Sequence, residues 1–263
     1  MDLQLKSKTA FISGSTQGIG FAIAKQLLKE GAKVIINGRT QKKIDLAIRK
    51  LTEEIPDADV YGIPADFANA DEVNQLLAKL PDTDILINNV GIFELKPFAQ
   101  IGDEDWSKIF EVNVLSGIRL SRLLLPKMLE KKWGRVIFIS SESGINIPEH
   151  MIHYGMTKTA MLSISNGLAK LTKNTEVTVN TILGGPTYSD GVAETITQIA
   201  QAQQQDITEI KSYVMNNYNP SSLLQRFIDP SEIANLVVYL SSPLSIATNG
   251  SALRADGGVL NTI

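Results

Sequence analysis

The sequence predicts an α/β fold: a doubly wound, seven-stranded parallel sheet with helices on both faces, giving three α/β/α layers. Short β-branched, apolar runs alternate with longer amphipathic segments along the whole chain, and this alternation is typical of parallel sheets with right-handed crossovers. The runs are mostly apolar throughout, as in strands that are buried on both faces. The chain has 263 residues, a length that one α/β domain often reaches. We therefore expect a single domain over 1–263.

The expected elements follow one another in order along the chain. We expect strands at KTAFIS (8–13), KVIIN (33–37), DVYGIP (59–64), DILIN (84–88), RVIFIS (135–140), VTVNTIL (177–183) and SALRA (251–255). Between them we expect helices at 18–30, 40–54, 69–80, 104–131, 152–173 and 230–241. Gly31 follows the first helix as a stop signal, and Asp229-Pro230 opens the last helix.

One segment, at about 186–229, interrupts the alternation because it contains no obvious strand. It is mostly polar and is expected to be helical in part. An insertion of this length in a compact domain is usually functional, so we expect a lid over a substrate site. A peripheral helical hairpin that serves only assembly is the alternative interpretation.

Composition excludes several classes of function. The chain has 25 Lys and Arg against 28 Asp and Glu, a net charge of −3, so no basic excess indicates nucleic acid or an anionic membrane as a partner. Cysteine is absent, which excludes disulfides, thiolate metal sites and cysteine nucleophiles. No apolar run approaches the ~20 residues that cross a bilayer, and the N-terminus lacks a secretion pattern, so we expect a cytoplasmic protein. His150 and His153 lack a third ligand at suitable spacing, so no metal is expected.

A glycine-rich turn follows the first strand, with the sequence SGSTQGIG at 13–20. Its glycines let the backbone turn sharply and bring the N–H groups of a helix N-terminus up to a pyrophosphate, in a Rossmann-like arrangement. Glycines also make ordinary strand-to-helix turns, but the position after the first strand favours phosphate binding. The residues expected to contact a dinucleotide here are Gly14, Thr16, Gln17, Gly18, Ile19 and Gly20.

The second expected strand ends in Asn37-Gly38-Arg39, where dinucleotide folds usually place an acid that binds the adenosine ribose. Gly38 leaves space and no negative charge, and Arg39 offers a guanidinium that binds phosphate through charge-assisted bonds. This favours NADP(H) over NAD(H). Alternatively, Arg39 is simply part of a solvated loop tip with Lys42 and Lys43.

Tyr154 and Lys158 stand four residues apart on an expected helix, so both side chains reach a common ligand. A phenol has a reference pKa near 10. A nearby ammonium stabilises the phenolate and lowers that pKa toward neutrality, where the tyrosine can exchange protons. Such a pair alone is common by chance, and it gains meaning from the motifs around it.

Those motifs are NNVG at 88–91, Asn113, Ser141, YGMTK at 154–158 and LRADGG at 253–258. Together with the glycine-rich turn, they make the chain similar to the short-chain dehydrogenase/reductase family over essentially its whole length. Ser141 stands 13 residues before Tyr154, which is the family's spacing between its catalytic serine and tyrosine.

The resemblance implies four catalytic residues. Tyr154 would give its proton to the carbonyl oxygen as hydride arrives, and Ser141 would hydrogen-bond the same oxygen. Lys158 would bind the nicotinamide ribose and lower the pKa of Tyr154. Asn113 would hold a water molecule that connects the lysine to solvent, or would simply satisfy a buried carbonyl.

The resemblance also implies further cofactor contacts beside those of Arg39, Tyr154 and Lys158. These are Asp66 and Phe67 at the adenine, Asn89 and Gly91 near the adenosine ribose, and Gly185 and Thr187 near the nicotinamide. Asp66 could instead cap the helix expected from 69. Gly184 replaces the family's proline after the sixth strand, and we expect a looser backbone there.

We therefore expect an NADP(H)-dependent enzyme that transfers hydride between nicotinamide and a ketone, aldehyde or secondary alcohol, with some likeness to 3-oxoacyl reductases. The alternatives are a catalytically silent nucleotide-binding sensor or scaffold, an enzyme running isomerisation or dehydration, and an NAD-dependent alcohol dehydrogenase. The expected partners are a small carbonyl or alcohol substrate and further copies of the chain. The resemblance implies a homotetramer in which the helices at 104–131 and 152–173 pair. Lys211 is the only basic residue between Gly184 and Gln225, which disfavours a strongly anionic substrate.

Overall fold

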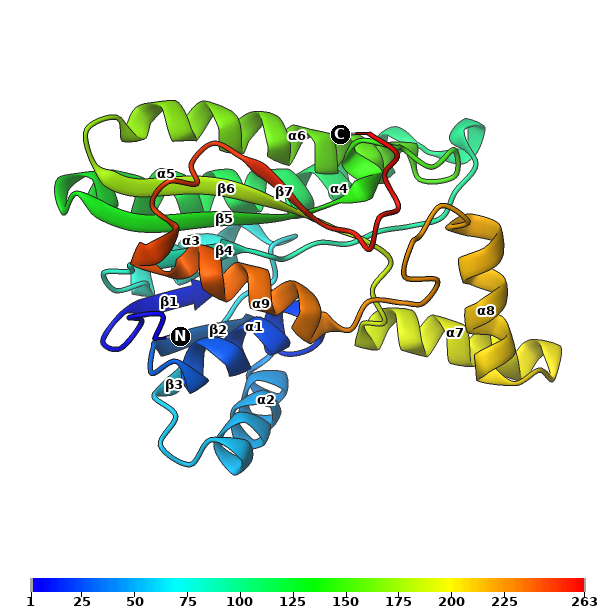
Figure 1. The fold of residues 1–263 in the computed structure, drawn as a ribbon, viewed down its shortest axis with the longest axis horizontal. Coiled ribbons are helices and arrows are strands. Elements are labelled where there is room, and N and C mark those ends of the chain that lie inside the picture. Colours follow the sequence, from blue (N-terminus) through cyan, green and yellow to red (C-terminus); the bar gives the residue numbers. More distant parts are fainter. Residues whose placement is uncertain (1, 263) are drawn as a thin grey trace.

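Seven parallel strands form one sheet in the computed structural model, which describes residues 2–262 (Figure 1). The strand order is β3-β2-β1-β4-β5-β6-β7. The strands are β1 (Thr9–Ile12), β2 (Lys33–Gly38), β3 (Val60–Pro64), β4 (Ile85–Asn88), β5 (Trp133–Ser141), β6 (Glu176–Gly184) and β7 (Ala252–Ala255). The order runs outward in both directions from β1 and β4, so the carboxyl ends of these two strands form the switch point at which such sheets bind ligands.

The helices are α1 (Gly18–Lys29), α2 (Gln41–Glu54), α3 (Ala70–Lys79), α4 (Asp103–Phe110), α5 (Ser116–Glu130), α6 (Ile152–Ala169), α7 (Asp190–Gln203), α8 (Ile207–Tyr218) and α9 (Pro230–Ser241). Short 3-10 turns lie at η1 (Phe98–Gln100), η3 (Glu142–Gly144), η4 (Lys170–Thr172) and η5 (Pro243–Ser245). A π turn, η2 (Glu111–Leu115), joins α4 to α5.

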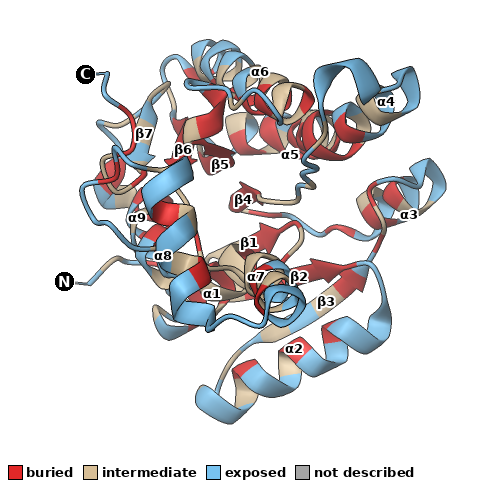
Figure 2. Cartoon of the chain, turned by 90° about the vertical axis from the view of Figure 1, so that its right-hand side faces the viewer, coloured by how far each residue is buried: buried red, intermediate tan, exposed pale blue. Residues whose placement is uncertain are grey.

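Two hydrophobic clusters lie on opposite faces of the sheet because successive strand residues point to opposite sides. On one face, Ile12 and Ile36 pack with apolar residues of α1, α2 and α9. On the other face, their neighbours Phe11 and Ile35 pack with residues of α3, α5 and α6. Figure 2 shows the buried strands between helices whose outer sides are exposed. The predicted three-layer, doubly wound fold is confirmed.

The helix expected over 104–131 is not continuous, because it divides at the π turn Glu111–Leu115. The turn holds Asn113, which is 1% exposed. A π turn adds one residue to a helical turn and occurs frequently at functional sites. Here it widens the helix beside α6 and turns the asparagine inward.

The insertion forms α7 and α8, which pack on each other through Ile196, Ala200 and Ile210. The two ends of the insertion meet at its base. Thr187 pairs with Ile228 as an isolated parallel bridge, and the Ile228 amide donates to the carbonyl oxygen of Pro186 at 2.8 Å. Figure 1 shows both helices standing beyond the carboxyl ends of the strands. The insertion therefore begins and ends at the same place beside the sheet, because its two ends are bonded to each other.

Two general features of the helices and side chains bear on function. No helix within residues 2–262 has the length and apolar character that crossing a membrane requires. Over the same residues, no group of three or more His, Cys, Asp or Glu side chains is placed to hold a metal ion.

Candidate active site

The glycine-rich turn joins β1 to α1 at the switch point of the sheet. Gly14 and Gly18 have φ angles of +62° and +60°, a region that side chains other than that of glycine rarely adopt. A Cβ atom at Gly20 would lie 2.5 Å from the carbonyl oxygen of Gly14 and 2.6 Å from Nδ2 of Asn89. All three glycines are therefore required by the local geometry, and Asn89 packs against the turn as part of it.

Two asparagines fix the position of the turn. Asn37 Oδ1 accepts from the Gly14 amide at 3.0 Å, and its Nδ2 donates to the carbonyl oxygen of Ile63 at 3.0 Å. Asn89 Nδ2 donates to the carbonyl oxygens of Ser13 and Gly14 at 3.0 and 2.8 Å. Asn37 is not among the site residues predicted from the sequence. Its signal was an amide at the buried end of the second strand, a position from which it connects β1, β2 and β3.

The N-terminus of α1 carries an unexpected carboxylate. The Gly18 amide donates to Oδ2 of Asp190, the first residue of α7, at 2.6 Å. Backbone N–H groups at a helix N-terminus attract anions, so Asp190 occupies an anion position of the turn. Beside it, Gln17 is exposed, and Thr16 and Ile19 are half-buried. The contact joins the insertion directly to the glycine-rich turn.

The surroundings of Gly38 differ from the expectation. A Cβ atom at Gly38 would lie 2.5 Å from Cγ2 and 3.3 Å from Oγ1 of Thr16. The expected open space at Gly38 is therefore wrong, because the Thr16 side chain fills it. Arg39 is exposed at the end of β2, so its guanidinium can reach a ligand at this edge.

Asp66 and Phe67 follow β3. Asp66 Oδ1 accepts from the Ala68 amide at 3.0 Å, which stabilises the turn after the strand. The N-cap of α3 is Asn69, so capping of that helix by Asp66 is wrong as an interpretation. The Phe67 side chain is 1% exposed and belongs to the core under α3, which leaves only its backbone to face a nucleotide.

The expected catalytic residues come from three elements. Ser141 ends β5, Tyr154 and Lys158 lie on α6, and Asn113 lies in the π turn. Lys158 Nζ lies 5.4 Å from the centroid of the Tyr154 ring. A Cβ atom at Gly91 would lie 3.5 Å from Lys158 Nζ and 3.6 Å from Asn113 Oδ1. The fold therefore places these residues, distant in sequence, side by side.

Asn113 is engaged by protein groups on both atoms of its amide. Its Oδ1 accepts from the Ile92 amide at 2.8 Å, and its Nδ2 donates to the Ile92 carbonyl oxygen at 2.9 Å and to Thr157 Oγ1 at 3.0 Å. These contacts match the interpretation that Asn113 satisfies a buried carbonyl, and they fix the loop after β4 against α6. The water-holding role stays a prediction.

Burial shifts the pKa values of both α6 residues. Burial raises the pKa of Tyr154, the charge of Glu142 raises it further, and a hydrogen bond with Ser141 opposes the rise. Burial lowers the pKa of Lys158 to about 8, against a rise caused by Glu142. Lys158 Nζ donates to the carbonyl oxygen of Ile139 at 3.0 Å. The expected lowering of the tyrosine pKa is therefore absent from this structure, because burial and the charge of Glu142 both raise it and only the hydrogen bond with Ser141 lowers it.

Glu142, which is not among the site residues predicted from the sequence, follows the serine directly in the chain. Its carboxylate accepts from Ser141 Oγ, from the Ser143 amide at 2.7 Å and from Ser143 Oγ at 3.1 Å. Burial raises the pKa of Glu142. The available signal is a charged residue that follows directly on the two serines at the end of β5.

The segment after β6 is held firmly. Gly184 pairs with Ser141 on one side and with Ala255 on the other, so the expected looser backbone is wrong. A Cβ atom at Gly185 would lie 2.5 Å from the Asp256 carbonyl oxygen, so glycine permits this close approach. Thr187 Oγ1 donates to the Gly185 carbonyl oxygen at 2.9 Å.

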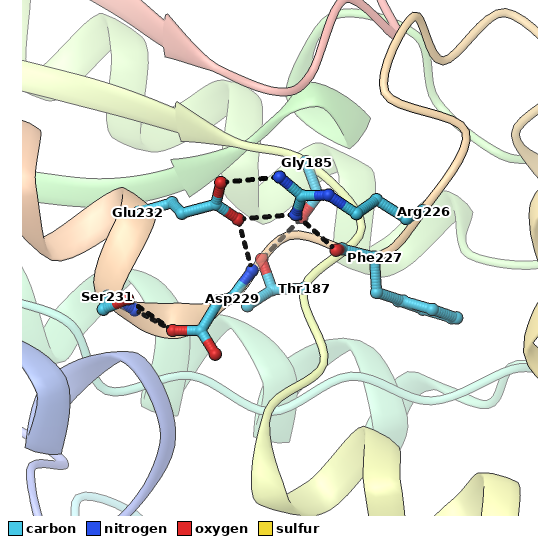
Figure 3. A network of polar contacts seen from close by, with 7 residues as sticks. All are labelled: Gly185, Thr187, Arg226, Phe227, Asp229, Ser231 and Glu232. Atoms are coloured by element: carbon cyan, nitrogen blue, oxygen red, sulfur yellow. Dashed lines mark hydrogen bonds and ion pairs between the residues drawn. The ribbon is translucent and has the colours of Figure 1, made fainter.

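The C-terminal end of the insertion is bonded to α9, as Figure 3 shows. Arg226 makes two hydrogen bonds to the Glu232 carboxylate, both at 2.8 Å. Glu232 also accepts from the Asp229 amide, and Asp229 caps α9 through Ser231. The segment from Thr187 to Asp229 is thus tied at both ends, whereas α7 and α8 between them pack mainly on each other.

Of the two histidines, His153 is buried, with its ring centroid 5.9 Å from that of Trp106. His150 lies beside Glu149 on the surface, at 3.3 Å. Both precede Tyr154, and their different surroundings give them no common ligand position.

The family model for short chain dehydrogenases matches residues 8–200. The chain belongs to this family. An uncharacterised oxidoreductase of Bacillus subtilis, YvrD, is 48% identical over 267 residues, with 100% of both chains covered. The 3-oxoacyl-[acyl-carrier-protein] reductase FabG of Aquifex aeolicus is 29% identical, with 98% of this chain and 100% of that protein covered.

Among solved structures, L-sorbose reductase from Gluconobacter frateurii, complexed with NADPH and L-sorbose, matches with a TM-score of 0.93. It is 29% identical, and the match covers 100% of both chains. The resemblance found in the sequence motifs is thus confirmed, and the protein is an oxidoreductase of the short-chain dehydrogenase family that acts on CH–OH or C=O groups.

Proposed function

We propose that this short-chain dehydrogenase is an NADP(H)-dependent carbonyl reductase. It reduces a ketone or aldehyde to an alcohol and catalyses the reverse oxidation. The observation that carries the proposal is the cluster of Ser141, Tyr154 and Lys158 at the same sheet edge as the glycine-rich turn. The likeness to a reductase complexed with NADPH supports it.

The glycine-rich turn fits a dinucleotide because its Gly14 and Gly18 backbone is left-handed and its amides lie at the N-terminus of α1. Bound NADPH would supply the hydride that forms the new C–H bond. Tyr154 then gives its phenolic proton to the carbonyl oxygen, so that hydride and proton together turn C=O into CH–OH. Its raised pKa keeps that proton in place until the oxygen becomes basic.

Ser141 and Lys158 support this proton transfer. Ser141 at the end of β5 orients the carbonyl oxygen by a hydrogen bond. Lys158, with a pKa of about 8, is charged at neutral pH and binds the nicotinamide ribose. The same charge stabilises the phenolate left after transfer. Asn113, fixed to Ile92 and Thr157, positions the loop and α6 around these groups.

Arg39 supports the choice of NADP(H) over NAD(H). It is exposed at the end of β2, and a guanidinium binds a 2′-phosphate through charge-assisted bonds. Thr16, which fills the space beside Gly38, presents its hydroxyl at the same edge. No acid stands at the end of β2 to repel the phosphate.

We also propose that α7 and α8 act as a lid over the substrate. The insertion is fixed at its base by the bridge of Thr187 to Ile228. Beyond the base it exposes large apolar side chains, including Tyr218 at 69% and Leu223 at 84%. Tyr218 and Ile145, in the loop after β5, both line a hollow of about 350 Å³, a size suited to a small organic substrate.

For assembly we propose the family's homotetramer. On α6, Gly167 faces open space: a Cβ atom there would meet no heavy atom within 4 Å in the part of the chain described. Gly155, in contrast, packs inward against Ile147, so it serves the fold of the monomer. Light scattering should give about four times the 28.7 kDa chain mass. A stable monomer at micromolar concentration would refute this assembly.

The experiment for the reductase activity is a panel of ketones and aldehydes assayed with both reduced nicotinamides. We expect oxidation of NADPH that depends on the carbonyl compound and yields the alcohol. A protein that binds NADPH but oxidises it with no member of the panel would be a nucleotide sensor. A product at the same oxidation state as the substrate would indicate isomerisation or dehydration.

A further inference from the structure

Glu142 places a carboxylate within hydrogen-bond reach of Ser141, the serine that orients the carbonyl oxygen. This glutamate is half-buried in the turn η3 that follows β5. Its charge acts on Tyr154 and Lys158 as well. A buried charge requires hydrogen-bond partners. A substrate that binds beside Ser141, Tyr154 and Lys158 therefore has to leave the Glu142 carboxylate with such partners.

The hydroxyl of Ser141 donates its proton to Glu142 in this structure, whereas the proposed reaction requires it to donate to the carbonyl oxygen of the substrate. A serine hydroxyl has one proton to donate, and here that proton goes to Glu142. While it stays there, Ser141 can accept from Tyr154 but cannot donate to a carbonyl oxygen. A productive substrate must therefore give the Glu142 carboxylate another donor.

We propose that Glu142 selects ketones that carry a hydroxyl group next to the carbonyl, an inference that rests on the proposed reductase activity. In an α-hydroxy ketone, the carbonyl and hydroxyl oxygens stand on adjacent carbons, so they can face Ser141 Oγ and the Glu142 carboxylate, which are hydrogen-bonded to each other. The substrate hydroxyl donates to Glu142, and the Ser141 proton turns to the carbonyl oxygen. Each of the four oxygens then has a partner.

The acceptor capacity of Glu142 allows this arrangement. A carboxylate offers about four acceptor positions. The Ser143 amide and the Ser143 hydroxyl take two of them and hold the side chain in place. Ser141 takes a third, so an incoming hydroxyl finds one position open and gains another when Ser141 turns away.

The charges around Glu142 disfavour anionic substrates. Asp256, after β7, adds a second carboxylate whose charge acts on Glu142. Its own counter-charge is Arg254, at 3.0 Å. Lys158 donates to the Ile139 carbonyl oxygen, on the strand that leads to Ser141. A keto acid would bring its carboxylate toward that of Glu142, whereas a neutral hydroxy ketone brings a donor.

The test compares hydroxyacetone with methoxyacetone, each with saturating NADPH. The methyl ether keeps the electron-withdrawing oxygen, so the intrinsic reactivity of the carbonyl is similar, but it cannot donate. We expect kcat/KM to be at least roughly tenfold higher for hydroxyacetone, the factor that a hydrogen bond to a charged group contributes. In Glu142→Leu the ratio should fall toward one, with Glu142→Gln between the two.

The matched control is Glu149→Gln, which removes an exposed carboxylate from the same loop and should leave the ratio unchanged. Pyruvate and its methyl ester test the charge: the wild type should favour the ester, and Glu142→Gln should reduce that preference. Equal kcat/KM for the two acetones in the wild type, or a ratio that Glu142→Leu and Glu142→Gln both leave intact, overturns the inference. If no ketone at all oxidises NADPH, the proposed reductase activity itself fails.

Discussion

Replacing Arg39 with glutamine should reduce the preference for NADPH over NADH. The change keeps a polar side chain at the end of β2 and removes its charge. A hydrogen bond to a charged group contributes about 1.5–3 kcal/mol, and exposure to solvent places Arg39 at the low end of that range. The wild type should therefore prefer NADPH by roughly tenfold, since about 1.4 kcal/mol corresponds to a factor of ten. Arg39→Gln should remove most of that factor.

The structure decides which variants are informative here. Introducing aspartate at Gly38 to attract the ribose of NADH would force a Cβ atom to within 2.5 Å of Thr16 Cγ2. Such a variant would disturb the glycine-rich turn, so reduced activity would not report on charge. Gly38→Ala is the control for this steric effect, because it adds the Cβ atom without a charge. It should weaken NADPH and NADH alike and leave their ratio unchanged.

The assay measures kcat/KM for each cofactor with one ketone that the enzyme reduces efficiently. Lys42→Gln tests the alternative that the basic loop tip acts only through its general charge, because Lys42 is an exposed cation at the start of α2. We expect Lys42→Gln to change the cofactor ratio much less than Arg39→Gln. A wild type that prefers NADH, or an unchanged ratio in Arg39→Gln, would refute the role of Arg39.

Three further predictions follow from the site and its supports. Asp190→Asn should tighten NADPH binding about two- to fivefold, or about 0.3–1 kcal/mol, because a carboxylate no longer competes for the Gly18 amide. Fluorescence titration measures the affinity for NADPH, and weaker binding in the variant would contradict this prediction. The kcat/KM for NADPH should fall above about pH 8 as Lys158 loses its proton, and this limb should disappear in Lys158→Arg. The pKa of Glu232 is lowered from 4.5 to about 2 by Arg226, so its contribution to the free energy of unfolding is present above about pH 4.5 and is lost toward pH 2. Urea unfolding at several pH values should show less acid sensitivity in Glu232→Gln than in the wild type.

The fold could be predicted from the sequence because its signals are local and agree with one another. The central strands β1, β2 and β4 are short runs that are mostly apolar and buried, the pattern that burial on both faces requires, whereas the edge strands β3 and β7 are partly exposed. The division of the helix at the π turn was not predictable in this way. The run from Asp103 to Glu130 keeps its helical character through Asn113, and only contacts with Ile92 and Thr157 show why the turn widens.

The sequence predicts those residues of the candidate site that stand in a recognisable motif, where the residue type itself indicates the role. Gly14, Ser141 and Tyr154 are of this kind. The residues that were missed act through partners distant in the chain. Asn37 binds Gly14, and Asp190 binds Gly18 across 172 positions. No local pattern reveals such pairs, because they form only when the sheet brings its carboxyl edge together.

Two expectations failed for a related reason. The sequence predicts open space at Gly38 and a loose backbone at Gly184. In the structure Thr16 fills the first position and sheet pairing on both sides fixes the second. A missing side chain leaves room only when no neighbour packs into it, and the sequence does not show which neighbour does.

The most direct test of the reductase account is turnover by Tyr154→Phe. The variant removes one hydroxyl and keeps the ring that packs near Phe93, so folding and NADPH binding should survive. With the best ketone of the panel, kcat should fall by about 10²–10⁴-fold, the range for loss of a positioned proton donor. Thermal unfolding and NADPH titration on the same samples confirm that the protein is intact. A variant that binds NADPH normally and retains more than roughly a tenth of the wild-type kcat would contradict the account, since on that scale Tyr154 would not be the proton donor.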